Sequence, residues 1–166
     1  MAEKSVISIR DHGALDLLLS LLEQGISVHI RVSGNSMKPL LNGGEIVEVA
    51  PLAEQHPKIG DILFLCDPQN KPLVHRLIRR RYYKGVLYLQ TKGDAHAGFD
   101  AFVPADRVSG RIRRIIIPSD LNKNKGRRAE KKIDLFTPFM RFQACFIVSH
   151  TLILYYLRRI KILLKW

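Results

Sequence analysis

Two residues of the types used in nucleophilic catalysis, Ser36 and His75, stand 39 positions apart in the chain. Ser36 lies in the turn-forming sequence SGNSMKPLL (Ser33–Leu41), directly after an alternating apolar stretch, and His75 lies in the apolar segment VHRL. A serine hydroxyl is a weak nucleophile at neutral pH, and a neighbouring neutral imidazole can accept its proton during attack. The pair therefore suggests the acyl-transfer chemistry of a serine hydrolase.

Each half of this pair is a weak signal alone, because serines in turns and histidines in strands are usually structural. Three glycines, Gly34, Gly43 and Gly44, surround Ser36 in the sequence. Glycine permits the close approach and unusual torsions needed by a backbone that presents a side chain to a bound peptide. The surroundings of Ser36 thus favour a functional turn.

Five motifs in a fixed order add to this signal: the run Val32–Leu41, GGEIVEV (Gly43–Val49), IGDILFL (Ile59–Leu65), PLVHRLI (Pro72–Ile78) and QTKGDAHAGFD (Gln90–Asp100). The order resembles that of the type I signal peptidases, in particular the Ser/His branch of archaea and the endoplasmic reticulum; in the bacterial Ser/Lys branch a lysine stands at the position of His75. The resemblance extends from about Val28 to Ile115.

The resemblance implies a role for each site residue. Ser36 would be the nucleophile, His75 the general base, and Asp100, six residues beyond Asp94, the acid that orients the imidazole. Asp94 would be the structural or alternative acid, satisfied by backbone donors or by a neighbouring arginine. The backbone N–H of Ser36 would donate to the oxyanion. Gly34 stands where many relatives place a second donor, so Asn35 and Ser33 are both candidates for it.

The activity implied by the resemblance is that of a serine endopeptidase that removes the leader or signal segment of a peptide or membrane precursor, after small residues at the first and third positions before the cut. The alternative is a non-catalytic or self-cleaving repressor-like relative with a regulatory or nucleic-acid-linked binding role. Such relatives use a lysine base, and the repressors carry a helix-turn-helix. Here the base position is His75, and the stretch before the first long strand has room for about one helix, so both observations count against the alternative.

No cofactor or metal is expected. His75, Asp94 and His96 show no recognised metal-ligand spacing. The stretch Arg76–Lys84 interleaves basic and aromatic residues and could bind nucleic acid, but a solvated hairpin rim is the more usual interpretation. Nothing in the sequence indicates an oligomeric state.

The charge distribution indicates an anionic partner. The chain has 27 basic and 15 acidic residues, a net charge of +12, which favours nucleic acid or a lipid surface. Ten of the basic residues lie between Arg107 and Lys132, and this run leads into an apolar tail. The tail, Phe142–Leu157, has 16 residues without a formal charge apart from the titratable His150, and arginines bracket it.

A membrane-spanning helix needs about 20 apolar residues, so the tail is short. It could lie in the membrane interface, re-enter the membrane, span it with help from flanking residues, or pack as a buried helix. We expect membrane association. The basic run before the tail favours a cytoplasmic catalytic domain, whereas secretory signal peptides are cut on the opposite face. The first apolar stretch, Leu15–Leu22, is too brief for a signal peptide or anchor.

The positioning elements are mainly strands. Asp11–Glu23 is an amphipathic helix, and Leu73, His75 and Leu77 share one face of a strand. We expect a mainly β fold, a curled antiparallel sheet or partial barrel, with an N-terminal helix and a C-terminal apolar and basic helix. Residues 1–117 would form the catalytic domain, 118–132 a basic linker and 133–166 a membrane-associated helical segment. The other expected strands are 28–32, 45–49, 61–65, 73–79, 86–91 and 107–117.

Overall fold

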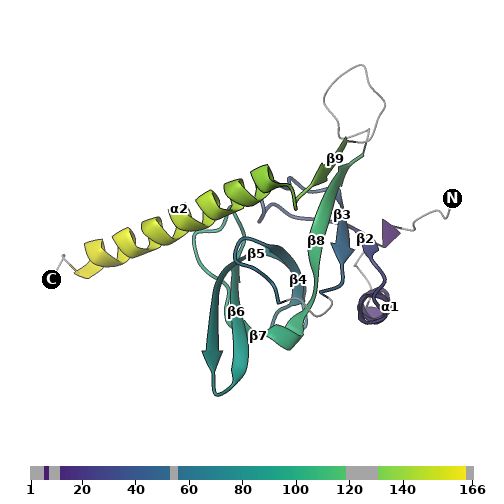
Figure 1. Cartoon of the computed structure of the whole chain (residues 1–166), viewed down its shortest axis with the longest axis horizontal. Coiled ribbons are helices and arrows are strands. Elements are labelled where there is room, and N and C mark those ends of the chain that lie inside the picture. Colours follow the sequence, from purple (N-terminus) through teal and green to yellow (C-terminus); the bar gives the residue numbers. More distant parts are fainter. Residues whose placement is uncertain (1–5, 8–11, 53–55, 119–130, 164–166) are drawn as a thin grey trace.

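The computed structural model describes residues 6–7, 12–52, 56–118 and 131–163. Within these residues the elements are two α-helices, nine strands and one short 3₁₀ helix (Figure 1). In chain order they are β1 (Val6–Ile7), α1 (His12–Glu23), β2 (Val28–Arg31), β3 (Ile46–Ala50), β4 (Ile62–Cys66), β5 (Pro72–Tyr83), β6 (Val86–Lys92), β7 (Phe102–Pro104), η1 (Ala105–Arg107), β8 (Val108–Ile117), β9 (Lys131–Asp134) and α2 (Pro138–Leu163).

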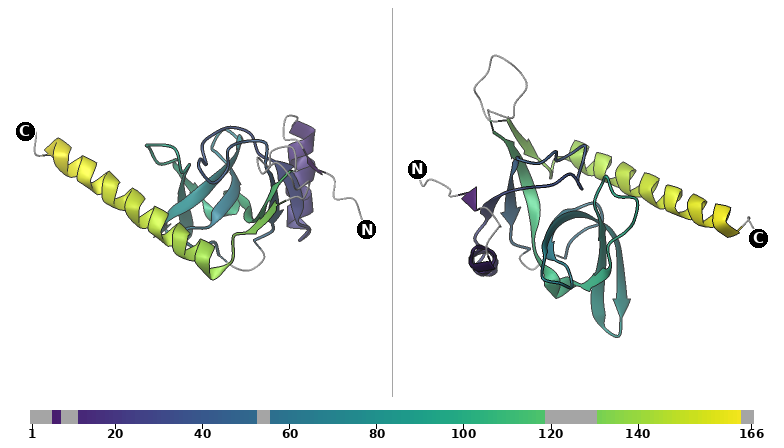
Figure 2. Two further views of the ribbon diagram at one scale, coloured as in Figure 1. Left: turned by 90° about the horizontal axis from the view of Figure 1, so that it is seen from above. Right: turned by 180° about the vertical axis from the view of Figure 1, so that it is seen from behind.

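The strands form one curled sheet. Their order is β1-β2-β3-β8-β4-β5-β6-β7, and β9 pairs with β8. Every pairing is antiparallel except that between β1 and β2, which is parallel. The sheet curls into a half-barrel, so the expectation of a mainly β, curled antiparallel sheet with a helix near each end of the chain is confirmed (Figures 1 and 2).

Strand β4 is the centre of the core because it is buried on both faces. Phe64 packs on one side with residues of α1, β2, β3 and β8, and Leu63 and Leu65 pack on the other with residues of β5, β6 and β8. Alternate side chains of a strand point to opposite faces, so one apolar strand supports two separate clusters. This arrangement fixes the backbone of β4, and β5 is paired directly with it.

Strand β8 joins the two parts of the sheet. It pairs with β3 along one edge, and along the other it pairs first with β4 and then with β9. A Cβ atom at Gly110 would lie 2.6 Å from a methyl group of Val49 and 2.8 Å from the carbonyl oxygen of Ala50, so the strands approach too closely for any side chain there. Register shifts in both pairings give the sheet its bend.

Strands β5 and β6 form a long hairpin that extends beyond the half-barrel (Figure 1). Lys84 and Gly85 close it with φ angles of 48° and 78°, as a two-residue type I′ turn requires. The solvated rim expected for Arg76–Lys84 is correct for the exposed tip, where Tyr82 is 71% exposed, but wrong for the buried Arg76.

The two helices differ in their packing. Leu15, Leu18 and Leu22 of α1 are buried against the sheet, as the heptad-like spacing predicts. Helix α2 runs along one side of the curled sheet and extends past it, away from α1 (Figures 1 and 2). Thr137 caps α2, because its hydroxyl accepts the Met140 N–H at 3.3 Å.

Helix α2 is attached to the sheet near its start. The Arg141 guanidinium lies 3.0 Å from Oδ1 of Asp61, and a Cβ atom at Gly60 would lie 3.1 Å from that of Ala144. From the sequence, Lys131 and Lys132 were expected in the basic linker, and the helical segment was expected to begin at residue 133. In the structure Lys131–Asp134 is instead strand β9, and residues 119–130 of the expected linker lie outside the described residues. Neither described helix combines the length and the apolar character that crossing a membrane requires.

Candidate active site

Ser36 lies in the turn that follows β2, and both sides of this turn are anchored. The next side chain, Met37, is buried in the core at 3% exposure. The carbonyl oxygen of Ser36 accepts the backbone N–H of Ala95 at 2.8 Å, so the turn is tied to the loop after β6. Gly34 has a φ of +88°, a torsion that favours glycine. These constraints hold the Ser36 hydroxyl at the surface of a rigid scaffold.

Gly93 forms the opposite wall of this turn. A Cβ atom there would lie 2.7 Å from the Ser36 carbonyl oxygen and 3.0 Å from the Ser36 Cβ. Both distances are shorter than van der Waals contact. Glycine at position 93 is therefore required by the close approach of the two backbone segments, independently of its torsion angles.

His75 lies on β5 and is only 4% exposed. It pairs across the ladder with Leu63 of the central strand. Its Nδ1 lies 2.7 Å from Oδ2 of Asp100, so the ring is held by a charge-assisted hydrogen bond when Nδ1 carries the proton. In that tautomer Nε2 is free to accept a proton.

Asp100 is held by β6 as well as by His75. The Thr91 hydroxyl donates to Oδ2 at 2.7 Å, and the Gln90 side-chain amide donates to the Asp100 carbonyl at 3.0 Å. The Asp100 N–H donates to the Thr91 carbonyl at 2.9 Å. Both the backbone and the side chain of Asp100 are thus fixed.

The Asp100 carboxyl group favours its ionised form. Burial raises its pKa, but the hydrogen bonds from His75 and Thr91 and the charges of His75 and His96 lower it by more. The pKa of Asp100 therefore lies below its ordinary value of 3.8. A carboxylate that stays ionised at neutral pH can stabilise an imidazolium ion beside it.

Asp94 has a different partner. The Arg76 guanidinium binds it through two parallel hydrogen bonds, Nε to Oδ1 at 2.8 Å and Nη2 to Oδ2 at 2.7 Å. A third donor of Arg76 reaches the Gly60 carbonyl at 3.0 Å. Both side chains of this pair are almost fully buried. The structure thus places Asp100 on His75 and Asp94 on the next residue of the same strand.

A cavity of about 450 Å³ opens between the β2 end of the sheet and the start of β5. Ser36 and His75 both line it, and so does His96, whose ring meets that of His75 edge to face with centroids 5.5 Å apart. Within the described residues no hydrogen bond joins Ser36 to His75. Catalytic hydrogen bonds are often long in unliganded enzymes and shorten when substrate binds.

The two candidates for a second oxyanion donor are placed differently. All three residues of this stretch are exposed, but Ser33 and Gly34 line the cavity and Asn35 is not among the residues that line it. The Asn35 carbonyl accepts the Lys38 N–H at 3.2 Å within the turn. Of the two, the structure brings Ser33 to the cavity that holds Ser36.

Several residues of the site did not emerge from the sequence analysis. The sequence does contain a pattern that could have identified Thr91. It follows Leu87 and Leu89 at the two-residue spacing of one strand face, and all three side chains are buried. A polar residue at such a position needs a buried partner. Gln90, Gly93 and Phe99 lie within the motif that carries Asp94 and Asp100, but nothing in their types indicates what they contact.

No protein-family model matches the chain, and no curated protein matches its sequence.

Proposed function

We propose that the protein is a signal-peptidase-like serine endopeptidase that removes the leader or signal segment of a peptide or membrane precursor. The observation that carries this proposal is the contact of 2.7 Å between His75 Nδ1 and Asp100 Oδ2 at the wall of a cavity that Ser36 also lines. Ser36 and the His75–Asp100 pair come from three distant segments and lie at one cavity, which supports the assignment of nucleophile, base and orienting acid.

The reaction is an acyl transfer in two halves. Ser36 Oγ attacks the scissile carbonyl carbon while its proton passes to Nε2 of His75, and Asp100 stabilises the imidazolium ion. The tetrahedral intermediate collapses, the C–N bond breaks, and His75 returns the proton to the leaving amine. Water then attacks the acyl group, His75 takes a proton from it, and Ser36 recovers that proton as the acyl–oxygen bond breaks.

The negative charge on the carbonyl oxygen needs fixed donors. The backbone N–H of Ser36 supplies the first. Ser33, which lines the same cavity, is better placed than Asn35, which does not line it, to supply the second. The ion pair between Arg76 and Asp94 has a structural part in this mechanism, since it holds the start of the loop that ends at Asp100.

The substrate cavity is suited to an extended peptide. Its volume of about 450 Å³ is in the usual range for ligand sites. Its walls combine apolar side chains, among them Val32, Leu41 and Phe64, with the polar groups of the site. A leader segment with small residues next to the cut, the substrate implied by the resemblance, would leave room for the backbone to reach Ser36.

We also propose that α2 holds the enzyme on an anionic lipid surface. Five apolar side chains on its solvent side are half or more exposed and recur at helical spacing. We term them the outer stripe of α2: Phe139, Phe142, Phe146, Ile153 and Leu157.

Charge complementarity favours lipid as the partner of the outer stripe. Lys131 and Lys132 are exposed just before α2, and the sequence adds Arg158, Arg159 and Lys161 in its last turns. Apolar residues on one face together with flanking basic residues are typical of helices that lie in the membrane interface. A peptidase held there would meet precursors whose leader segments are apolar.

The test of the proposed activity uses detergent-solubilised membrane proteins as substrate. After incubation with the wild-type chain, mass spectrometry of protein N-termini identifies new cleavage sites. Ser36→Ala and His75→Ala should each abolish them, and the double variant should be hardly less active than either single variant because the residues act as a unit. Ser109→Ala and His56→Ala, outside the cavity, serve as controls. Unchanged cleavage by Ser36→Ala would end the proposal.

A further inference from the structure

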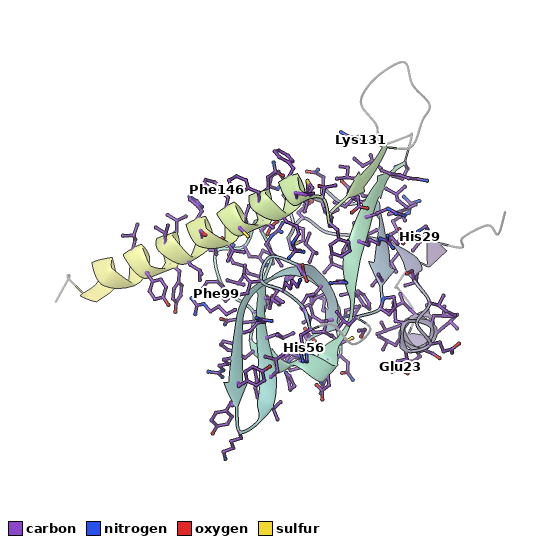
Figure 3. All side chains as sticks on the ribbon, viewed as in Figure 1. Glu23, His29, His56, Phe99, Lys131 and Phe146 are labelled. Carbon is purple, nitrogen blue, oxygen red and sulfur yellow. The ribbon has the colours of Figure 1, made fainter. Side chains whose placement is uncertain are left out.

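The residue before Asp100, Phe99, lies at the junction between β5 and α2, and Figure 3 shows it beneath the helix. Its ring meets that of Tyr155 edge to face, with centroids 4.9 Å apart. The Arg79 guanidinium lies over both rings, 4.6 Å from the centroid of Phe99 and 4.9 Å from that of Tyr155. We term Arg79, Phe99 and Tyr155 the aromatic clasp.

The charge of Arg79 makes the clasp more than an apolar contact. Its Nη2 atom is buried and has no hydrogen-bond partner in the described structure. A buried guanidinium nitrogen without a partner is costly. The faces of Phe99 and Tyr155, with Tyr156 further out at 5.8 Å, supply the compensating cation–π attraction. Separating α2 from β5 would remove the Tyr155 and Tyr156 faces from Arg79 and leave that of Phe99, so the cation–π contacts favour the docked helix.

The clasp fixes the end of a loop that is otherwise open to solvent. Residues 95–98 are exposed, whereas Phe99 is half-buried. On the far side of Phe99, Asp100 is bound by Thr91 and Gln90 of β6. The carboxylate therefore approaches His75 from a backbone that is held on one side by β6 and on the other by the clasp.

We infer that α2 positions Asp100 against His75 through the aromatic clasp, so that Arg79, Phe99 and Tyr155 are positioning residues for the active site. This inference rests on the proposed peptidase function. None of the three residues lines the cavity, so they act through Asp100 and not on the substrate.

The test compares Tyr155→Ala with Tyr155→Phe in the full-length protein. Each is assayed on a peptide that the wild type cleaves, selected from a proteome-derived peptide library. Tyr155→Ala should lower kcat by about tenfold to a hundredfold, since small displacements of a catalytic group have effects of this size, while KM changes by less than about twofold. Tyr155→Phe, which keeps the ring, should retain wild-type kcat. Tyr82→Ala, which removes an exposed tyrosine from the hairpin tip, is the matched control.

A second measurement needs no substrate. Long-range ¹H–¹⁵N spectra report which imidazole nitrogen of His75 carries the proton. In the wild type we expect Nδ1–H, and Tyr155→Ala should shift the population toward Nε2–H. If the wild type cleaves no peptide and this shift is still seen, the proposed function fails and the positioning role stands.

Two results would overturn the positioning role. One is a folded Tyr155→Ala with wild-type kcat and an unchanged His75 spectrum. If Tyr155→Ala does not fold, Arg79→Met takes its place in both measurements, because it keeps an unbranched apolar stem and removes the guanidinium group that lies over the two rings. Wild-type behaviour of a folded Arg79→Met would overturn the inference equally.

Discussion

Thr91 and His75 bind the same oxygen atom: the Thr91 hydroxyl and the His75 Nδ1 each lie 2.7 Å from Oδ2 of Asp100. Two donors on one oxygen fix the carboxylate in position and in rotation about its last bond. Because Thr91 and His75 lie on neighbouring strands, the position of the acid is set by the sheet.

The first prediction concerns this shared oxygen. Thr91→Val keeps the shape of a fully buried side chain but removes the hydroxyl. Hydrogen bonds to charged groups contribute about 1.5–3 kcal/mol, so kcat/KM should fall by about tenfold or more. Steady-state kinetics on a cleaved peptide measure the change. Thr91→Ser, which restores the hydroxyl, should recover most of the activity, and a valine variant as active as the wild type would contradict the role.

The second prediction separates the two aspartates. Asp100→Asn should leave the protein folded and lower kcat by about a thousandfold or more, because the amide can hold the imidazole in the wrong tautomer. Asp94→Asn should act on stability, since it leaves Arg76 buried without its carboxylate; breaking a buried ion pair in this way costs about 3–5 kcal/mol. Urea denaturation and kinetics of both variants distinguish the two effects. A stable Asp94→Asn protein that is inactive would reverse the assignment.

The third prediction follows from the pKa of Asp100. Its pKa in the folded state lies below the ordinary value of 3.8, which is the value expected in the unfolded chain. The carboxylate therefore contributes stability that is complete above 3.8 and is lost as the pH falls through the folded-state pKa. The wild type should have a higher free energy of unfolding than Asp100→Asn. This difference should be constant above about pH 5 and should shrink below pH 3.8. A difference that grows on acidification would show the opposite shift.

The fourth prediction concerns the close approach of Gly93 and Ser36. Gly93→Ala would push its Cβ into the Ser36 carbonyl oxygen, and backbone atoms cannot move aside cheaply. We expect kcat/KM to fall by about a hundredfold, because displacements near 1 Å are costly in catalysis. Gly98→Ala is the control: it lies in the same loop, a Cβ there meets nothing within 4 Å, and its activity should be unchanged. Equal activity of the two alanine variants would show that Ser36 is not constrained from this side.

The fifth prediction tests the outer stripe of α2. The wild type should sediment with vesicles that contain phosphatidylserine, and high salt should release it, since surface attraction to anionic lipid is screened. Phe142→Ser and Phe146→Ser should each weaken binding. Tyr82→Ser, equally exposed but on the hairpin, should bind as the wild type does. Binding of the phenylalanine variants at the wild-type level would exclude the stripe as the lipid contact.

The sequence predicted most of the scaffold because apolar periodicity carried it. The helix before Gly25 and six of the strands were expected within a few residues of their observed bounds. Strands β1, β7 and β9 were not expected. They have two to four residues each, too few for an alternating pattern to appear. Strand β9 also lies beside a basic run, so its pairing with β8 depends on tertiary contact and not on its own composition.

Only part of the site could be predicted from the sequence, because its contacts join distant segments. Motif order gave the candidates Ser36, His75, Asp94 and Asp100, and their types limited what each could do. The choice between the two aspartates depends on which side of β5 each carboxylate meets, which the chain order alone does not determine. The aromatic clasp could not be predicted from the sequence. It joins Arg79 to Tyr155 across 76 positions (155 minus 79), and its residue types are common on any surface.

His75 and Arg76 are consecutive residues of one rigid strand, and each grips one end of the segment between Asp94 and Asp100. The length of that segment is therefore set by the separation of His75 and Arg76 on the strand. In its exposed middle, residues 95–98, His96 contacts the His75 ring and lines the cavity, and the side chains of the other three positions can vary. The number of residues in the segment cannot change, because one inserted or deleted residue would move Asp94 away from Arg76 or Asp100 away from His75. In other chains with this arrangement, the segment between the two aspartates should therefore vary in sequence and keep a constant length.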